Sequence, residues 1–222
     1  MTTVTGTEGR GAAAPAPGGG QTGTVMGPAA TAEVVQVADP APLGLAGFGL
    51  TTMVLSVINA GWIDAAATPV VLSLALPYGG IAQALAGMWA FRRGNTFAAT
   101  AFTSYGAFWL SYFLLVNGLA KAVSNPVALS AILGTYLFMW GIFTLYMFIA
   151  SLGGVRAVQG VFLFLTATFM FLAFGAWSND PTSVLTKIGG YLGIITAILA
   201  LYTSFADVTN ATLKRTVLPT DF

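Results

Sequence analysis

Six long apolar stretches separated by short polar turns dominate this 222-residue sequence. A helix needs about 20 apolar residues to cross the hydrocarbon core of a bilayer, and each stretch is long enough. Charged residues make up only 7% of the chain, against about 25% in ordinary soluble domains. The sequence therefore predicts an all-α integral membrane protein with six transmembrane helices at Leu43–Ile63, Pro69–Phe91, Thr96–Leu119, Pro126–Ala150, Val155–Trp177 and Val184–Phe205.

The amino-acid composition divides the chain into a tail and a membrane domain. Residues 1–37 are rich in Gly, Ala, Thr and Pro, and such a segment buries too little apolar surface to offset the entropy of ordering it. We expect a disordered cytoplasmic tail at 1–37, a six-helix transporter domain at 38–219 and a short C-terminal tail at 220–222.

The distribution of Lys and Arg predicts the orientation. With the N-terminus inside, the cytoplasmic segments near the membrane hold five basic residues and the opposite loops hold two, Lys121 and Lys187. Cytoplasmic loops of membrane proteins carry the excess of positive charge. We therefore expect a multi-pass protein of the cytoplasmic (inner) membrane with both termini in the cytoplasm.

Several classes of function are excluded by residue counts. The chain has no Cys and no His, which removes thiolate and imidazole metal sites, disulfides and haem-binding helices. No basic cluster exceeds two residues and no GxxxxGK[ST] motif is present, so neither nucleic-acid binding nor ATP hydrolysis is expected. We predict no metal site, no cofactor and no enzymatic activity.

The polar groups inside the predicted spans are neutral. All seven acids lie in tails, loops or outer turns, whereas proton relays place a carboxylate or His at mid-membrane. Any coupled proton should therefore travel on the substrate. The hydroxyls and amides of Gln83, Thr103 and Ser104 could hydrogen-bond a carboxyl group, or they could bond helix backbones. Phe48, Tyr105 and Leu165 could likewise be core residues or a pore constriction.

Several motifs resemble one family. Asp39 to Leu45 reads DPAPLGL, where the family has NPAPLGL, and GFG follows at Gly47 to Gly49. Further matches are YGGIAQ (Tyr78–Gln83), GNTF (Gly94–Phe97), AFTSYGAFWLS (Ala101–Ser111), WGIFTLYMF (Trp140–Phe148) and RTVLP (Arg215–Pro219). Together they extend over Ala38 to Pro219, and the chain resembles the acetate uptake transporter (AceTr) family, close to the bacterial succinate–acetate permeases.

The resemblance implies an assembly and a site. It implies six-helix protomers in a ring-shaped homohexamer, each with its own pathway for acetate and related small monocarboxylates. Phe48, Tyr105 and Leu165 would form a hydrophobic constriction, with Ala200 as a small pore-facing residue. The entrance and substrate-binding residues would be Asp39, Pro40, Ala41, Pro42, Leu43, Gly44, Leu45, Gln83, Thr103 and Ser104.

Some alternatives stay open at this point. Asp39 replaces the family's Asn; it serves equally well as a helix cap, but its charge would repel an anion at the mouth. The sequence does not distinguish a channel from a proton symporter, or acetate from succinate as the preferred cargo. The other readings of the chain are a non-transporting membrane scaffold or sensor, and a channel for ammonia or another small neutral solute.

Overall fold

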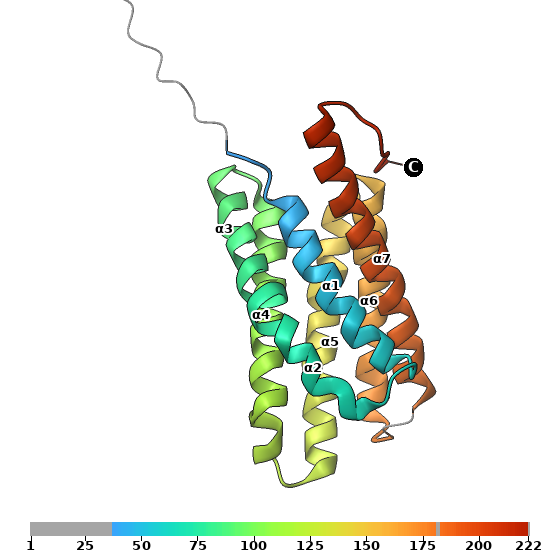
Figure 1. Cartoon of the computed structure of the whole chain (residues 1–222). Helices are drawn as coiled ribbons and strands as arrows, with labels where there is room; N and C mark the ends of the chain where they lie inside the picture. Colours follow the sequence, from blue (N-terminus) through green and yellow to red (C-terminus); the bar gives the residue numbers. More distant parts are fainter. Residues whose placement is uncertain (1–36, 181–182, 222) are drawn as a thin grey trace, which may run out of the picture. The chain divides into compact units, whose positions relative to one another are not determined.

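The computed structural model describes residues 37–180 and 183–221 and contains six helical spans (Figure 1). The predicted tail at 1–37 lies outside the described residues except for Val37. Each span is long and apolar enough to cross a membrane. The spans are α1 (Ala41–Asn59), α2 (Thr68–Leu74) continued through a π-helical stretch (Ala75–Ala82) into α3 (Gln83–Arg92), α4 (Thr96–Asn117), α5 (Pro126–Ser151), α6 (Arg156–Trp177) and α7 (Val184–Leu213).

Asparagine caps begin two of these helices. The side chain of Asn95 accepts a hydrogen bond from the backbone N–H of Ala98 at the start of α4. Asn125 accepts from Val127 and Ala128 at the start of α5. These bonds satisfy backbone donors that have no partner within the helix.

Two predicted helix ends differ from the structure by four residues or more. The first helix ends at Asn59 instead of Ile63, because Gly61 adopts a positive φ of 80° and turns the chain. The last helix continues to Leu213 instead of ending at Phe205. The final turns of this helix are polar but still helical, so a boundary placed from hydropathy alone falls too early in the sequence.

The second span contains a wide π-helical stretch that the sequence did not predict. Pro77 lies within it, and proline lacks the N–H that an α-helix needs at that position. A Cβ on Gly79 would lie 2.7 Å from the Thr51 hydroxyl and 2.9 Å from the Trp109 ring. Glycine therefore allows this stretch to pack closely against α1 and α4.

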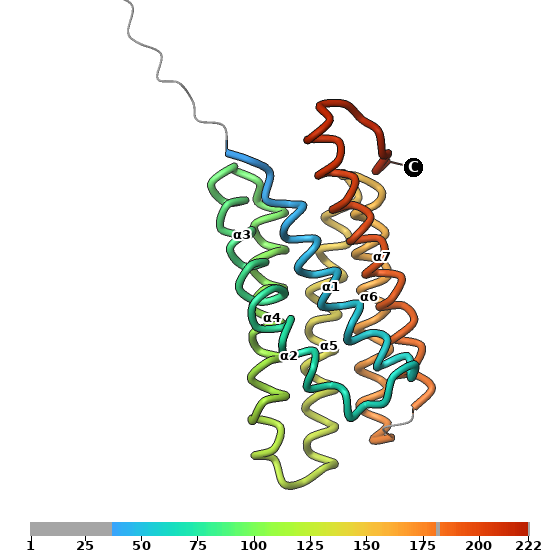
Figure 2. The backbone as a smooth tube through the Cα atoms, viewed as in Figure 1, coloured from blue at the N-terminus to red at the C-terminus, as the bar shows by residue number. Residues whose placement is uncertain are grey.

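The helices form a bundle in which α7 packs against both α1 and α6, α6 packs against α5, and α3 packs against α4 (Figure 2). By contrast, the backbones of α4 and α5 come close at few points, and these two helices meet mainly through side chains such as Tyr105 and Thr144. The helices that begin and end the domain are thus in close contact, while side chains from α1, α4, α5 and α6 face an incompletely filled interior.

The two ends of the bundle differ in charge. The start of α1 and the C-terminal segment lie at the same end (Figure 1). We call it the basic end, because the Lys and Arg residues here are Arg92, Arg93, Arg156, Lys214 and Arg215. Among the described residues, the opposite end holds only two, Lys121 and Lys187. The loops therefore divide five to two, as the orientation argument assumes.

The C-terminal segment folds back onto α6 at the basic end. The side-chain amide of Asn210 donates to the carbonyl of Leu218 and accepts from the N–H groups of Val217 and Leu218. The carbonyl of Thr220 accepts from the Ala157 N–H at 3.0 Å. Thr220, placed in the predicted tail, therefore takes part in the folded structure by capping α6.

Candidate substrate pathway

Two large cavities extend into the bundle from its opposite ends. The first cavity, of about 750 Å³, reaches inward from Asn59, Pro126 and Asn179 at the end opposite the basic end. The second cavity, of about 530 Å³, reaches inward from Asn95, Gly154 and Asp207 at the basic end. Together they occupy most of the distance across the bundle.

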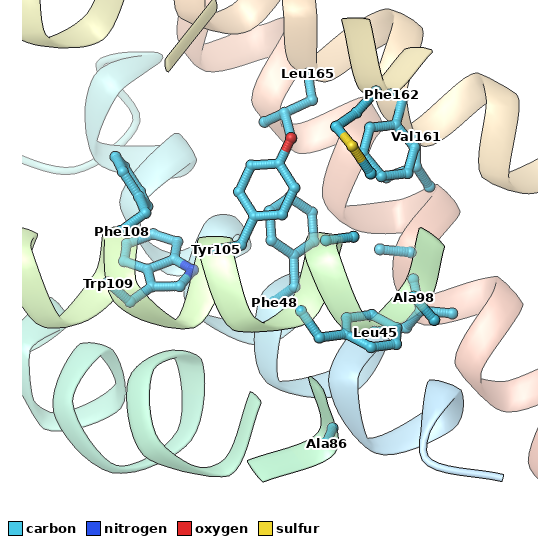
Figure 3. Close-up of a cluster of buried hydrophobic side chains, with 14 of the residues drawn as sticks. Leu45, Phe48, Ala86, Ala98, Tyr105, Phe108, Trp109, Val161, Phe162 and Leu165 are labelled. Atoms are coloured by element: carbon cyan, nitrogen blue, oxygen red, sulfur yellow. The ribbon is translucent and has the colours of Figure 1, made fainter. Parts of the chain in front are cut away.

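Phe48 of α1 and Leu165 of α6 line both cavities and therefore form the partition between them. Both side chains are nearly inaccessible, with exposed fractions of 4% and 3%. Tyr105 of α4 lines the second cavity, and its ring centroid lies 5.6 Å from that of Phe48. Figure 3 shows these three side chains close together.

Tyr105 is held in place by a hydrogen bond and by aromatic packing. Its hydroxyl donates to Thr144 Oγ1 at 2.9 Å, and that hydroxyl donates to the Trp140 carbonyl at 2.7 Å. The rings of Phe143 and Phe162 lie 5.4 Å and 6.1 Å from the Tyr105 ring. These contacts hold the Tyr105 ring in one position on the wall of the second cavity.

The residues of the predicted entrance motif lie in several different environments. Ala41 and Leu45 line the second cavity. Gly44 packs on the ring of Phe102, and Leu43 is 44% exposed on the outside of the bundle. The Pro42 carbonyl accepts from the Ser204 hydroxyl at 2.7 Å, which joins α1 to α7.

Asp39 and Pro40 lie beside the second cavity, in a small polar pocket that also contains Arg93. One carboxylate oxygen of Asp39 accepts from the Ala41 N–H at 2.9 Å, and the other pairs with the Arg93 guanidinium at 3.0 Å. The carboxylate that replaces the family's Asn is thus both a cap for α1 and an ion-pair partner. This pairing offsets its charge.

The remaining predicted residues are scattered. Gln83 is 1% exposed and lines the second cavity. Ser104 instead lines a separate groove with Thr135 and Tyr136. Thr103 packs against Gly87, and Ala200 is fully buried in the hydrophobic core. Thr103, Ser104 and Ala200 therefore line neither of the two cavities.

The sequence analysis assigned only Phe48 of a mixed polar and apolar stripe on α1 to the pathway. Phe48, Thr52, Leu55, Ser56 and Asn59 all line the first cavity. Their spacing of three and four residues places them on one face of a helix. This periodicity was available in the sequence, but a stripe that mixes aromatic, aliphatic and hydroxyl residues resembles an ordinary packing face.

Buried polar atoms without a partner gather at the cavity walls. In the described part of the chain four such side-chain atoms occur, on Thr52, Gln83, Thr103 and Trp109. Thr52 and Trp109 belong to the wall of the first cavity and Gln83 to that of the second. An unpaired buried polar group costs about 1–3 kcal/mol, so a guest with a carboxyl group would find unsatisfied donors and acceptors close to both cavities.

The comparisons with known proteins identify the family. The model of the GPR1/FUN34/yaaH family matches residues 21–220. The chain belongs to this family. It is 41% identical to the succinate-acetate/proton symporter SatP of Escherichia coli K12 over 83% of this chain and 95% of that protein.

A solved structure shares the fold. The structure of the bacterial acetate channel SatP aligns with a TM-score of 0.75 at 41% identity, covering 83% of this chain and 99% of that one. A more distant relative is named ammonia transport outward protein 2, from Saccharomyces cerevisiae; it is 36% identical over 84% of this chain and 67% of its own length. The predicted family and six-span fold are therefore confirmed.

Proposed function

We propose that this chain forms a membrane pathway for acetate and related small carboxylates. One observation carries the proposal: two cavities reach in from opposite ends of the bundle, and Phe48 and Leu165 separate them. Relatives named for succinate–acetate symport and acetate conduction support this cargo. A scaffold or sensor would need no such pair of cavities.

The chemistry of the partition favours the protonated acid. Phe48, Tyr105 and Leu165 offer the substrate apolar surface and one hydroxyl that is already bonded to Thr144. Removing an ion from water without a compensating partner is far more costly than removing a neutral acid. Acetic acid is thus expected to cross the partition more readily than the acetate anion, with hydroxyls and the Gln83 amide assisting on either side.

The proposal includes a membrane location, an orientation and an assembly for the pathway. We place the protein in the cytoplasmic membrane with the basic end inside, following the excess of Lys and Arg. A homohexamer with one pathway per protomer is the assembly that the family resemblance implies. Native mass spectrometry in a mild detergent tests this assembly, and monomers alone would contradict it.

Uptake of radiolabelled acetate into proteoliposomes tests the cargo. We expect saturable uptake that propionate and other short monocarboxylates inhibit, above the diffusion measured in protein-free vesicles. Uptake equal to that of protein-free vesicles at every pH would refute the proposal. The name of the yeast relative favours a second candidate, ammonia, and methylammonium uptake by the same vesicles, without acetate uptake, would establish it instead.

A further inference from the structure

The formal charges on the cavity walls have one sign. Among the described residues that line the two cavities there is no Lys or Arg. Each cavity has one carboxylate, Asp180 in the first and Asp207 in the second. A pathway for an anion is expected to carry positive charge or dense hydrogen-bond donors. These walls would instead repel a substrate that enters with its own negative charge.

Asp207 is the carboxylate on the wall of the second cavity, which also contains Gln83 and Tyr105. It lies on α7, is half-buried, and in the described part of the chain makes no hydrogen bond and no ion pair. Asp207 therefore has no positive partner on the wall that it shares with the substrate.

The other charged groups at the basic end are engaged elsewhere or lie off the cavity wall. Arg93 pairs with Asp39 at 3.0 Å, and Arg156 lies 3.8 Å from Asp221. The remaining cations at this end are Arg92, Lys214 and Arg215, all exposed. None of these side chains lines the second cavity, so none lies between Asp207 and an entering carboxylate.

We propose that Asp207 couples carboxylate movement to a proton in the second cavity. This inference rests on the proposed function. Two carboxylates close together in a poorly solvated site do not both stay ionised, and one proton is shared between them. A carboxylate anion would enter with one proton, held between its oxygen and that of Asp207. The proton then leaves on the substrate as the neutral acid, and Asp207 returns to its ionised form.

The proposal predicts electroneutral transport that depends on one side chain. In the wild-type protein one proton accompanies each monocarboxylate, so no net charge moves. Asp207→Asn removes the negative charge while keeping the size of the side chain, and the anion can then enter the second cavity alone. Transport by this variant should move net charge and should decline less as the pH rises.

The experiment measures acetate uptake into proteoliposomes under a potassium diffusion potential set with valinomycin. Moving one charge is worth about 2.3 kcal/mol per 100 mV, so about 60 mV acting on half of the path changes a rate about threefold. We expect uptake by the wild type to be unaffected by the potential, and uptake by Asp207→Asn to rise about threefold with a positive interior. Asp221→Asn is the matched control, because it removes a carboxylate at the same end that does not line the cavity.

The outcomes separate this inference from the proposed function. Wild-type vesicles without uptake would refute the function itself. If the wild type and Asp207→Asn both take up acetate and neither responds to the potential, only the role of Asp207 is overturned. If Asp207→Asn is folded but inactive, Asp207→Glu decides: active, electroneutral uptake by the Glu variant supports a required carboxylate. Inactivity of both variants would assign Asp207 to packing and overturn the inference.

Discussion

Replacing Leu165 by Ala distinguishes a pathway wall from a packed core. The change removes three carbon atoms, which at about 0.8 kcal/mol per buried group corresponds to about 2.4 kcal/mol of transfer free energy. In a close-packed core the new void adds to this cost, and Leu→Ala changes reach about 5 kcal/mol. Leu165 already borders two cavities of about 750 and 530 Å³, so the void term should be small. We expect a loss of about 2 kcal/mol in stability.

The assay pairs thermal melting in detergent with transport. Ile58→Ala is the matched control, because Ile58 is 7% exposed, belongs to the same hydrophobic core and is not among the residues lining either cavity. Leu165→Ala should melt above Ile58→Ala and should admit larger carboxylates such as lactate, since the partition is thinner. Equal destabilisation of the two variants, with an unchanged range of substrates in Leu165→Ala, would refute the reasoning.

Three further changes test other parts of the structure. Asn210→Ala removes three hydrogen bonds to the C-terminal segment and should lower stability by about 2 kcal/mol; an unchanged melting temperature would show that the segment is not anchored there. Gly190→Ala places a methyl group against the backbone at the end of α1 and should cost about 1–3 kcal/mol, whereas Gly118→Ala, with open space around it, should melt like the wild type. Asp39→Asn keeps the cap and loses only the exposed ion pair with Arg93, so its melting should correspond to a change within about 1 kcal/mol; a larger loss would mean that the pair holds the entrance together.

The fold could be predicted from the sequence because its strongest signals are local. Twenty-residue apolar runs depend only on neighbours along the chain, and the six spans followed from them. The π-helical stretch could not be predicted in this way. It depends on the approach of Gly79 to Thr51 and Trp109, which lie on two other helices.

A candidate site could be proposed from the sequence only where the family resemblance suggested one. Phe48, Tyr105 and Leu165 come from three helices, and no spacing along the chain indicates that they meet; only the resemblance suggested it. The same resemblance suggested Ala200, which the structure buries in the core. Asp207 was counted as an outer-turn charge, because the apolar pattern stops at Phe205 while the helix continues to Leu213.

The central claim is that the two cavities form one carboxylate pathway through the partition of Phe48 and Leu165. The chain has no cysteine, so a single thiol can be introduced by Thr168→Cys in the first cavity or by Ser151→Cys in the second. Ser124→Cys and Thr216→Cys provide the controls, because both residues are exposed in loops at opposite ends of the bundle and line neither cavity. We predict that a membrane-impermeant thiol reagent blocks acetate uptake by Thr168→Cys only from outside and by Ser151→Cys only from inside, that acetate slows both reactions, and that labelling either control position leaves uptake unchanged. Complete modification of both cavity positions with undiminished acetate uptake would contradict the account.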